Sequence, residues 1–167
     1  EPVLRELVRW DVPLSVDTMK VSVMRKALSL GVDILNDVNG FRAEGADALL
    51  AHSGCGAVVM HMQGEPRTMQ LAPQYGGVTR DVVAFLQQRV DALGHVGVQA
   101  ARVLVDPGFG FGKTLQHNLE LMRATPQFAT LAAGVLIGVS RKRMIGELCG
   151  QDEPSQRVAG SVAAGLY

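Results

Sequence analysis

Five times along the chain, a short apolar stretch ends in polar residues and is followed by a loop and a helical pattern. The stretches read VPLSVDT, VDILNDV, GAVVMHM, RVLVDPG and GVLIGVSRK, at residues 12–18, 32–38, 56–62, 102–108 and 134–142. Their near-continuous apolar letters are typical of parallel strands that are buried on both faces. Strands that alternate with helices predict a parallel α/β fold with right-handed crossovers.

Helical patterns separate these strands. We expect helices at residues 20–30, 44–52, 79–93, 114–123 and from 154 or 155 onward, with the tail of another helix at 1–10. Thr114 is a plausible N-cap for the fourth of them. Five strands allow either an open doubly wound sheet or the middle of an eight-stranded barrel. Because every strand ends in polar residues, and not only those at one switch point, the pattern favours the barrel.

The chain has 167 residues and a formal net charge of zero. This length suits one domain, and the charge argues against nucleic acid or an anionic membrane as the main partner. Its apolar runs fall short of the roughly 20 residues that a membrane helix needs. Two distant cysteines without secretory features indicate a reduced, cytoplasmic setting. The chain starts at Glu1 and stops inside a helical pattern at Tyr167, so we expect an excerpt of a longer protein.

Four strand ends carry the side chains of greatest chemical interest, which are Asp17, Asn36, Asp106 and Lys142. Each has a structural alternative: Asp17, for example, could cap a helix that begins near Met19. A carboxylate at a dry strand end is costly unless it has a partner. Together, two acids, an amide and a cation suit a flat heterocycle, because a carboxylate accepts paired N–H donors and an amide both donates and accepts.

The stretch VLVDPGFGFGKT, at residues 103–114, resembles a phosphate-binding loop but fits neither common template. The P-loop needs a glycine where Pro107 stands, and Gly108, Gly110 and Gly112 read G-x-G-x-G instead of the dinucleotide fingerprint. The loop is therefore interpreted through Asp106, the acid that precedes it.

Five motifs in order, SVDT, NDV, MHMQGEPRTMQ, DPGFGFGKT followed by HN, and GVSRKRMIG, closely resemble the dihydropteroate synthase family of bacterial folate synthesis. The resemblance runs from Val12 to Gly165. It implies a TIM-type (β/α)8 barrel, of which residues 1–167 form a single pterin-binding domain truncated at both ends. The chain would supply about five βα units, the third to the seventh. The family joins a dihydropterin-methyl diphosphate to 4-aminobenzoate and releases diphosphate, and sulfonamides compete for the aminobenzoate position.

The resemblance also implies roles for single residues. Asn36 and Asp106 match residues that hydrogen-bond the pyrimidine edge of the pterin. Asp17 matches an acid that stabilises positive charge as the methylene–oxygen bond breaks, and Lys142 matches a lysine that contacts the ring, so these two are the catalytic candidates. Further pterin-pocket positions are Val38, Met60, Phe111 and Gly138. The glycine loop is then a ring-binding loop that turns Phe111 toward the site.

One departure from the family lies beside Lys142, where Arg143 replaces a common serine near the aminobenzoate. Arg143 and Phe111 are therefore candidates for contacts with the second substrate. The family's magnesium-binding asparagine, Thr-Arg-Pro loop and Arg-x-His motif have no counterpart in this sequence. We expect Mg²⁺ to be bound upstream, no metal ligand in this segment, and a homodimer at full length.

Two other interpretations remain open. A pterin-binding methyltransferase domain uses a similar barrel, although DPGFGFGK and SRK favour the synthase. A non-catalytic pterin-binding module is a different class of answer. His61 we interpret as a buried, hydrogen-bonded histidine rather than a catalytic base.

Overall fold

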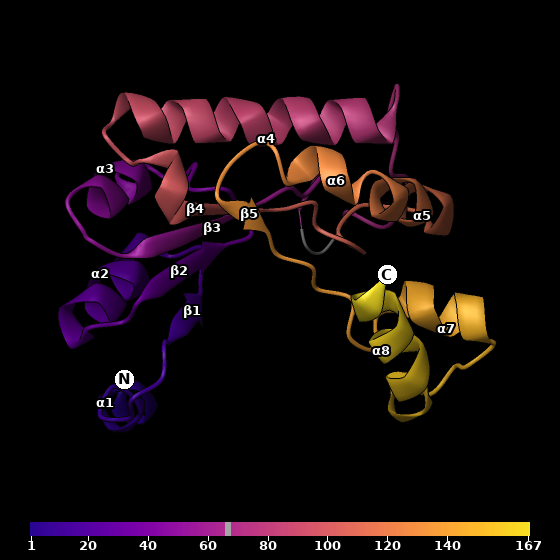
Figure 1. The fold of residues 1–167 in the computed structure, drawn as a ribbon, viewed down its shortest axis with the longest axis horizontal. Helices are drawn as coiled ribbons and strands as arrows, with labels where there is room; N and C mark the ends of the chain where they lie inside the picture. The colour runs from indigo at the N-terminus through magenta and orange to yellow at the C-terminus, as the bar shows by residue number, and fades with distance from the viewer. Residues whose placement is uncertain (66–67) are drawn as a thin grey trace.

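The structure is a computed structural model that describes residues 1–65 and 68–167. One parallel sheet runs through its centre (Figure 1). Its strands are β1 (Ser15–Asp17), β2 (Ile34–Asp37), β3 (Gly56–Met60), β4 (Val103–Asp106) and β5 (Gly134–Val135). They pair in chain order, β1-β2-β3-β4-β5, without a reversal. A doubly wound sheet reverses its order at a switch point, so the observed order matches the wall of a barrel.

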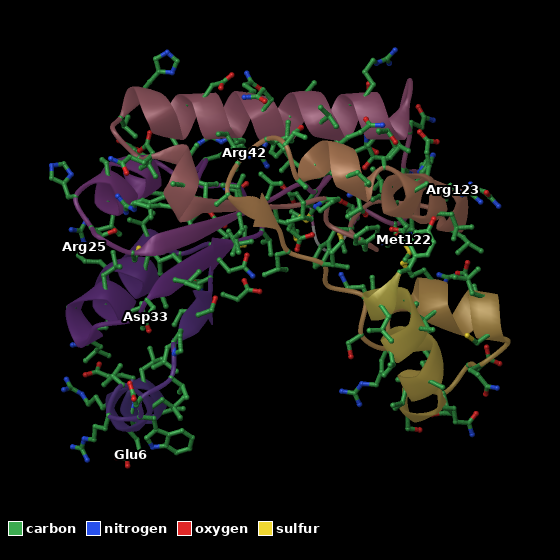
Figure 2. All side chains as sticks on the ribbon, in the orientation of Figure 1. Glu6, Arg25, Asp33, Arg42, Met122 and Arg123 are labelled. Carbon is green, nitrogen blue, oxygen red and sulfur yellow. The ribbon has the colours of Figure 1, made fainter. Side chains whose placement is uncertain are left out.

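The helices lie around the sheet, except that the last two pair with each other away from it (Figure 1). They are α1 (Pro2–Leu7), α2 (Val21–Leu30), α3 (Ala46–Ala51), α4 (Val78–His95), α5 (Leu115–Arg123), α6 (Thr125–Phe128), α7 (Arg143–Cys149) and α8 (Val158–Leu166). Two 3-10 turns, η1 (Ala100–Arg102) and η2 (Pro154–Arg157), precede β4 and α8. Met122 of α5 lies beside the α7–α8 pair (Figure 2), where it lines an apolar groove with Ile145 and Ala164.

Alternation along the strands separates the core face from the opposite face. Leu35, Val59 and Val105 are fully buried and belong to the core that the helices cover, together with Leu86 of α4 and Leu121 of α5. Successive side chains of a strand point to opposite faces. The strand residues next to these therefore face away from the helical layer, and this second face carries the predicted residues Asp17, Asn36 and Asp106.

Local signals predicted some boundaries and missed others. Thr114 is the N-cap of α5, as expected, and its hydroxyl accepts a hydrogen bond from the His117 N–H at 3.2 Å. α2 begins at Val21 rather than near Met19, and the Thr18 hydroxyl accepts a hydrogen bond from the Lys20 N–H at 3.2 Å. The structural alternative for Asp17, a helix cap at Met19, is therefore wrong.

At the amino end of the sheet, hydrogen bonds between Leu14 and Asp33 join the segments that precede β1 and β2. Asp33, which directly precedes β2, accepts a hydrogen bond from the Leu14 N–H at 2.7 Å (Figure 2). The carboxyl ends of the strands lie at the opposite edge. Because all five strands are parallel, their loops and terminal side chains meet at that one edge.

Candidate functional site

The strand register brings the predicted side chains to the same face. Asp17 of β1 is paired with Asn36 of β2, and Asn36 is paired with Val58 of β3. Two residues further along, Met60 is paired with Asp106 of β4. Since the side-chain period of a strand is two, all of these residues point to the face that lies away from the helices. Three strands thus contribute polar groups to one surface at the carboxyl edge.

Asn36 has an unusual hydrogen-bonding state. Its amide oxygen, Oδ1, is buried and has no hydrogen-bond partner among the residues that the structure describes. A buried acceptor left unpaired costs about 1–3 kcal/mol, and such groups are rare in folded proteins. The oxygen is therefore suited to accept a hydrogen bond from a ligand N–H.

Asp106 is only 5% exposed. One carboxylate oxygen, Oδ1, accepts a hydrogen bond from the Gly108 N–H at 2.7 Å. Burial raises the pKa of Asp106, while that hydrogen bond and the charges of Lys142 and Lys113 act to lower it. The carboxylate is thus mostly buried and within electrostatic reach of two cations, and a pair of ligand N–H donors would add favourable contacts to it.

The sequence predicted that Asp17 lies at a dry strand end. In the structure its side chain is exposed instead. β1 pairs with β2 and, within the described residues, has no strand on its other side. Partial burial still raises the pKa of Asp17. Its charge also acts on Asp37 and Asp106, which places its carboxylate within electrostatic reach of the strand ends.

Lys142 reaches the site from the N-cap of α7. Its ammonium Nζ donates a hydrogen bond to the Phe109 carbonyl and lies 4.7 Å from the centroid of the Phe111 ring. A Cβ added at Gly138 would lie 3.7 Å from the same Nζ, which is an ordinary van der Waals distance, so Gly138 is a direct neighbour of the lysine. Burial lowers the pKa of Lys142, and Asp106 opposes that shift. The structure therefore brings Lys142, Phe111 and Gly138 together.

The Ser-Arg-Lys turn that presents Lys142 is fixed by the last helix. Arg141 has φ +53°, a left-handed conformation that is uncommon for a residue with a side chain. Its N–H donates to the Ser161 hydroxyl at 2.8 Å, and its carbonyl accepts from Arg157 Nη1 at 3.0 Å. These two hydrogen bonds from α8 and η2 offset the cost of the backbone conformation.

The glycine loop after Asp106 is pressed against the chain that follows β3. Gly108 has φ +70°, and a Cβ there would lie 2.0 Å from the His61 carbonyl oxygen. Gly112 has φ +61°, and its Cβ would lie 2.6 Å from the Gln63 carbonyl oxygen. Both the dihedral angles and the close approach require glycine. This is the physical reason for the glycines that made the loop resemble a phosphate-binding sequence.

The remaining predicted positions are less tightly grouped. Met60 is 3% exposed and its Cγ lies against Gly108, whereas Val38 follows β2 and is half-buried. Arg143 is exposed and forms an ion pair with Glu147 at 2.7 Å. It lines a cavity of about 460 Å³ together with Gln70, Gly110, Lys113 and Met144, among other residues. The lining of this cavity does not include Phe111, so the two second-substrate candidates do not share it.

The sequence pattern missed one functional candidate and classified one histidine correctly. Lys113, the last residue before Thr114 in the stretch VLVDPGFGFGKT, is 4% exposed and donates hydrogen bonds to the Gly108 and Phe111 carbonyls of the glycine loop. His61 is 7% exposed, as expected of a buried, hydrogen-bonded histidine, and its Nδ1 lies 3.0 Å from Lys113 Nζ. Burial, with a smaller contribution from Lys113, lowers the pKa of His61 to about 3.

Metal-ligating side chains are scattered rather than clustered. Within residues 1–65 and 68–167, no group of three or more His, Cys, Asp or Glu side chains is arranged to hold a metal ion. The described part of the chain therefore offers no preformed cluster of such ligands for Mg²⁺. No helix in the described part of the chain has the length and apolar character needed to cross a lipid bilayer.

The fold and the site together define a class: α/β-barrel proteins that present polar groups for a ligand at the carboxyl ends of their strands. A family model described as "Pterin binding enzyme" matches residues 1–167. The chain belongs to this family of pterin-binding enzymes.

Several of its relatives are dihydropteroate synthases. The dihydropteroate synthase of Neisseria meningitidis serogroup C is 48% identical over 99% of this chain and 60% of the relative. The structure of dihydropteroate synthase from Thermus thermophilus in complex with 4-aminobenzoate is 49% identical, with a TM-score of 0.93, over 99% of this chain and 64% of that one. Dihydropteroate synthase from Xanthomonas albilineans in complex with 7,8-dihydropteroate is 44% identical, with a TM-score of 0.91. The match covers 99% of this chain and 62% of that one.

These comparisons confirm the resemblance to dihydropteroate synthase and the predicted fold class. The five parallel βα units are part of the (β/α)8 barrel of these enzymes. The chain spans about 60% of the length of the curated relatives that it matches.

Proposed function

We propose that the intact protein containing this chain is a dihydropteroate synthase that joins dihydropterin-methyl diphosphate to 4-aminobenzoate and releases diphosphate. The observation that carries the proposal is the buried Oδ1 of Asn36, which has no hydrogen-bond partner among the described residues and lies on the same face of the sheet as the buried carboxylate of Asp106. Two acceptors of this kind fit the N–H-rich edge of a pterin. The names of the relatives and the ligands of their structures support the same assignment.

In this proposal, Asn36 and Asp106 orient the ring. Asp106 accepts N–H donors of the guanidine-like edge through a charged hydrogen bond, and Asn36 Oδ1 gains the partner that it lacks among the described residues. Each charged hydrogen bond contributes about 1.5–3 kcal/mol. Val38, Met60, Phe111 and Gly138 form the pocket wall around the ring.

Asp17 and Lys142 act on the reacting end. The bond between the methylene carbon and the diphosphate oxygen breaks, and its electron pair leaves with the diphosphate. The amine nitrogen of 4-aminobenzoate then forms a bond to the cationic methylene carbon and loses one proton. Asp17 stabilises the positive charge of the pterin, and Lys142 contacts the ring beside Phe111. The contribution of the chain is therefore positioning and electrostatic stabilisation, without a covalent nucleophile.

Arg143 and Phe111 are proposed to contact the second substrate. The Arg143 guanidinium is exposed, so it is free to rotate toward an aromatic carboxylate. Its ion pair with Glu147 is at the surface, where such pairs contribute about 0–1 kcal/mol, and a substrate carboxylate can replace it.

Several features of the whole protein complete the proposal. We place residues 1–167 as the third to seventh βα units of a longer, single barrel domain, because the relatives extend beyond the matched segment. Mg²⁺, which would offset charge on the diphosphate, is assigned to residues outside this chain. A cytoplasmic homodimer is the proposed state of the intact protein.

The test is an assay of diphosphate release by the intact protein with both substrates, comparing wild type, Asn36→Ala and Asn39→Ala. Asn39 is a nearby asparagine whose Oδ1 already accepts a hydrogen bond from Arg42 at 2.8 Å. We expect kcat/KM to fall about 10-fold or more for Asn36→Ala and to stay near wild type for Asn39→Ala. Wild-type protein that binds pterin without releasing diphosphate would instead identify a non-catalytic module. Methyl transfer in place of condensation would identify the methyltransferase alternative.

A further inference from the structure

The glycine loop is held through its carbonyl groups. Each of the five carbonyls from Gly108 to Gly112 accepts a hydrogen bond from a side chain outside the loop. Lys113 donates to the first and the fourth, and Lys142 donates to the second. Gln70 donates to the third carbonyl and Tyr75 donates to the fifth. A loop with three left-handed glycines has few conformational preferences of its own, so these donors determine its shape.

Lys113 is the centre of this arrangement. Its Nζ lies 2.9 Å from the Gly108 carbonyl oxygen, 3.0 Å from that of Phe111 and 3.0 Å from His61 Nδ1, with the His61 carbonyl oxygen at 3.3 Å. An ammonium group has three protons, which matches the three shorter contacts. A neutral amine has only two and would leave one of these acceptors without its donor.

The same contacts connect Lys113 with the ring-binding residues. Gly108, whose carbonyl Lys113 holds, donates its N–H to Asp106 Oδ1 at 2.7 Å. Phe111, whose carbonyl Lys113 also holds, has its ring 4.7 Å from Lys142 Nζ. Lys113 therefore fixes the residues on both sides of the loop without being one of the proposed ligand contacts.

We propose that Lys113 is a positioning residue whose positive charge holds the Gly108–Gly112 loop, and with it Asp106 and Phe111, in the geometry that binds the pterin. The identity of the ligand in this inference rests on the proposed function. The contacts of Lys113 with the loop do not depend on it.

The hydrogen bonds from Lys113 to the loop depend on pH, because they require its ammonium form. Burial lowers the pKa of Lys113 to about 7, with Asp106 opposing the shift and Lys142 adding to it. His61 stays neutral because its pKa is about 3, so Nδ1 accepts and the ring proton belongs on Nε2. Other charged groups act on this centre electrostatically: Asp106 and Lys142 on Lys113, Arg42 and Asp81 on His61, and Asp17 on Asp106. The ring of Tyr75 lies 6.0 Å from that of His61. Pterin affinity should therefore be full well below pH 7, where Lys113 is charged, and fall as the pH rises through its pKa of about 7.

The first experiment measures calorimetric binding of dihydropterin-methyl diphosphate to the intact protein between about pH 6 and about pH 9, a range that brackets the Lys113 pKa. Wild type is compared with Lys113→Met, Lys113→Arg and the surface control Lys26→Met. We expect about 10-fold weaker binding for Lys113→Met at pH 6 and no further loss from this group at higher pH. Lys113→Arg keeps a permanent charge and should lose the alkaline decrease, while Lys26→Met should follow wild type.

Two results would overturn the inference: wild-type affinity at every pH in Lys113→Met, or an unchanged alkaline decrease in Lys113→Arg. If the role of Lys113 were merely structural, Lys113→Met would bind pterin more weakly, but its pH profile would be the same as that of wild type.

The second experiment needs neither a variant nor a ligand, so it remains decisive if Lys113→Met does not fold or if wild type does not bind pterin. Ring ¹⁵N chemical shifts of His61 should show the proton on Nε2 and should respond to pH with a midpoint near the Lys113 pKa of about 7. A proton on Nδ1 below that midpoint would contradict the proposed role of Lys113. Absence of pterin binding by wild type, with the expected His61 signals, would refute the proposed function and leave the geometric role of Lys113 standing.

Discussion

Gly108→Ala perturbs the site through a single added methyl group. The new Cβ would lie 2.0 Å from the His61 carbonyl oxygen, and real Cβ contacts essentially never fall below 3.0 Å. The loop must therefore move by at least about 1 Å, and a misplacement of that size can reduce a rate by about 10²-fold. The dihedral angle adds a separate cost, since φ +70° disfavours any L side chain by about 1–2 kcal/mol.

Gly31→Ala is the matched control. Gly31 ends α2 with φ +90°, and a Cβ there meets no atom within 4 Å. It therefore carries the dihedral cost of about 1–2 kcal/mol without the steric clash. Both variants should lose free energy of unfolding by at least that amount, measured by urea denaturation of the intact protein. Only Gly108→Ala should lose about 10²-fold in kcat/KM for diphosphate release.

The reasoning is refuted if Gly108→Ala retains wild-type kcat/KM and loses no more stability than Gly31→Ala. In that case the contact between the glycine loop and the His61 carbonyl does not set the geometry of Asp106.

Three further changes test other parts of the site. Asp106→Ala should weaken binding of dihydropterin-methyl diphosphate by about 1.5–3 kcal/mol in calorimetry, and unchanged affinity would contradict its role. Arg143→Ser should change the KM for 4-aminobenzoate and leave pterin affinity nearly constant; equal shifts in both, or in neither, would count against a second-substrate contact. Ser161→Ala removes the acceptor for the Arg141 N–H, so we expect a loss of about 1–3 kcal/mol in unfolding free energy and a lower kcat, because Lys142 is presented by that turn. A lower unfolding free energy with an unchanged kcat would show that the Arg141 turn does not affect the reaction.

The features predictable from the sequence were those that depend on neighbours in the chain. Near-continuous apolar strands that end in polar residues predicted the parallel sheet and placed Asn36 and Asp106 at its carboxyl edge, as the register confirms. The Thr114 cap was predictable for the same reason, since its partner His117 is three residues away.

The features that were missed depend on contacts between distant segments. Lys113 and His61 are separated by 52 residues, so no local pattern reveals that the lysine is buried behind the loop. The fifth strand was expected to reach Ser140, but β5 ends at Val135, because beyond it only the Leu136 N–H continues the pairing, to the Val105 carbonyl at 2.9 Å. Exposure of Asp17 likewise depends on β1 lying at the edge of the described sheet, which the letters SVDT do not show.

The central claim is that the strand ends bind a pterin ring through Asn36 and Asp106. A crystal structure of the intact protein with dihydropterin-methyl diphosphate tests it most directly. We predict a ring nitrogen at about 2.7–3.2 Å from Asn36 Oδ1, with the Asp106 carboxylate at the same edge of the ring. A bound ring located elsewhere, with Asn36 Oδ1 still lacking a donor, would contradict the claim.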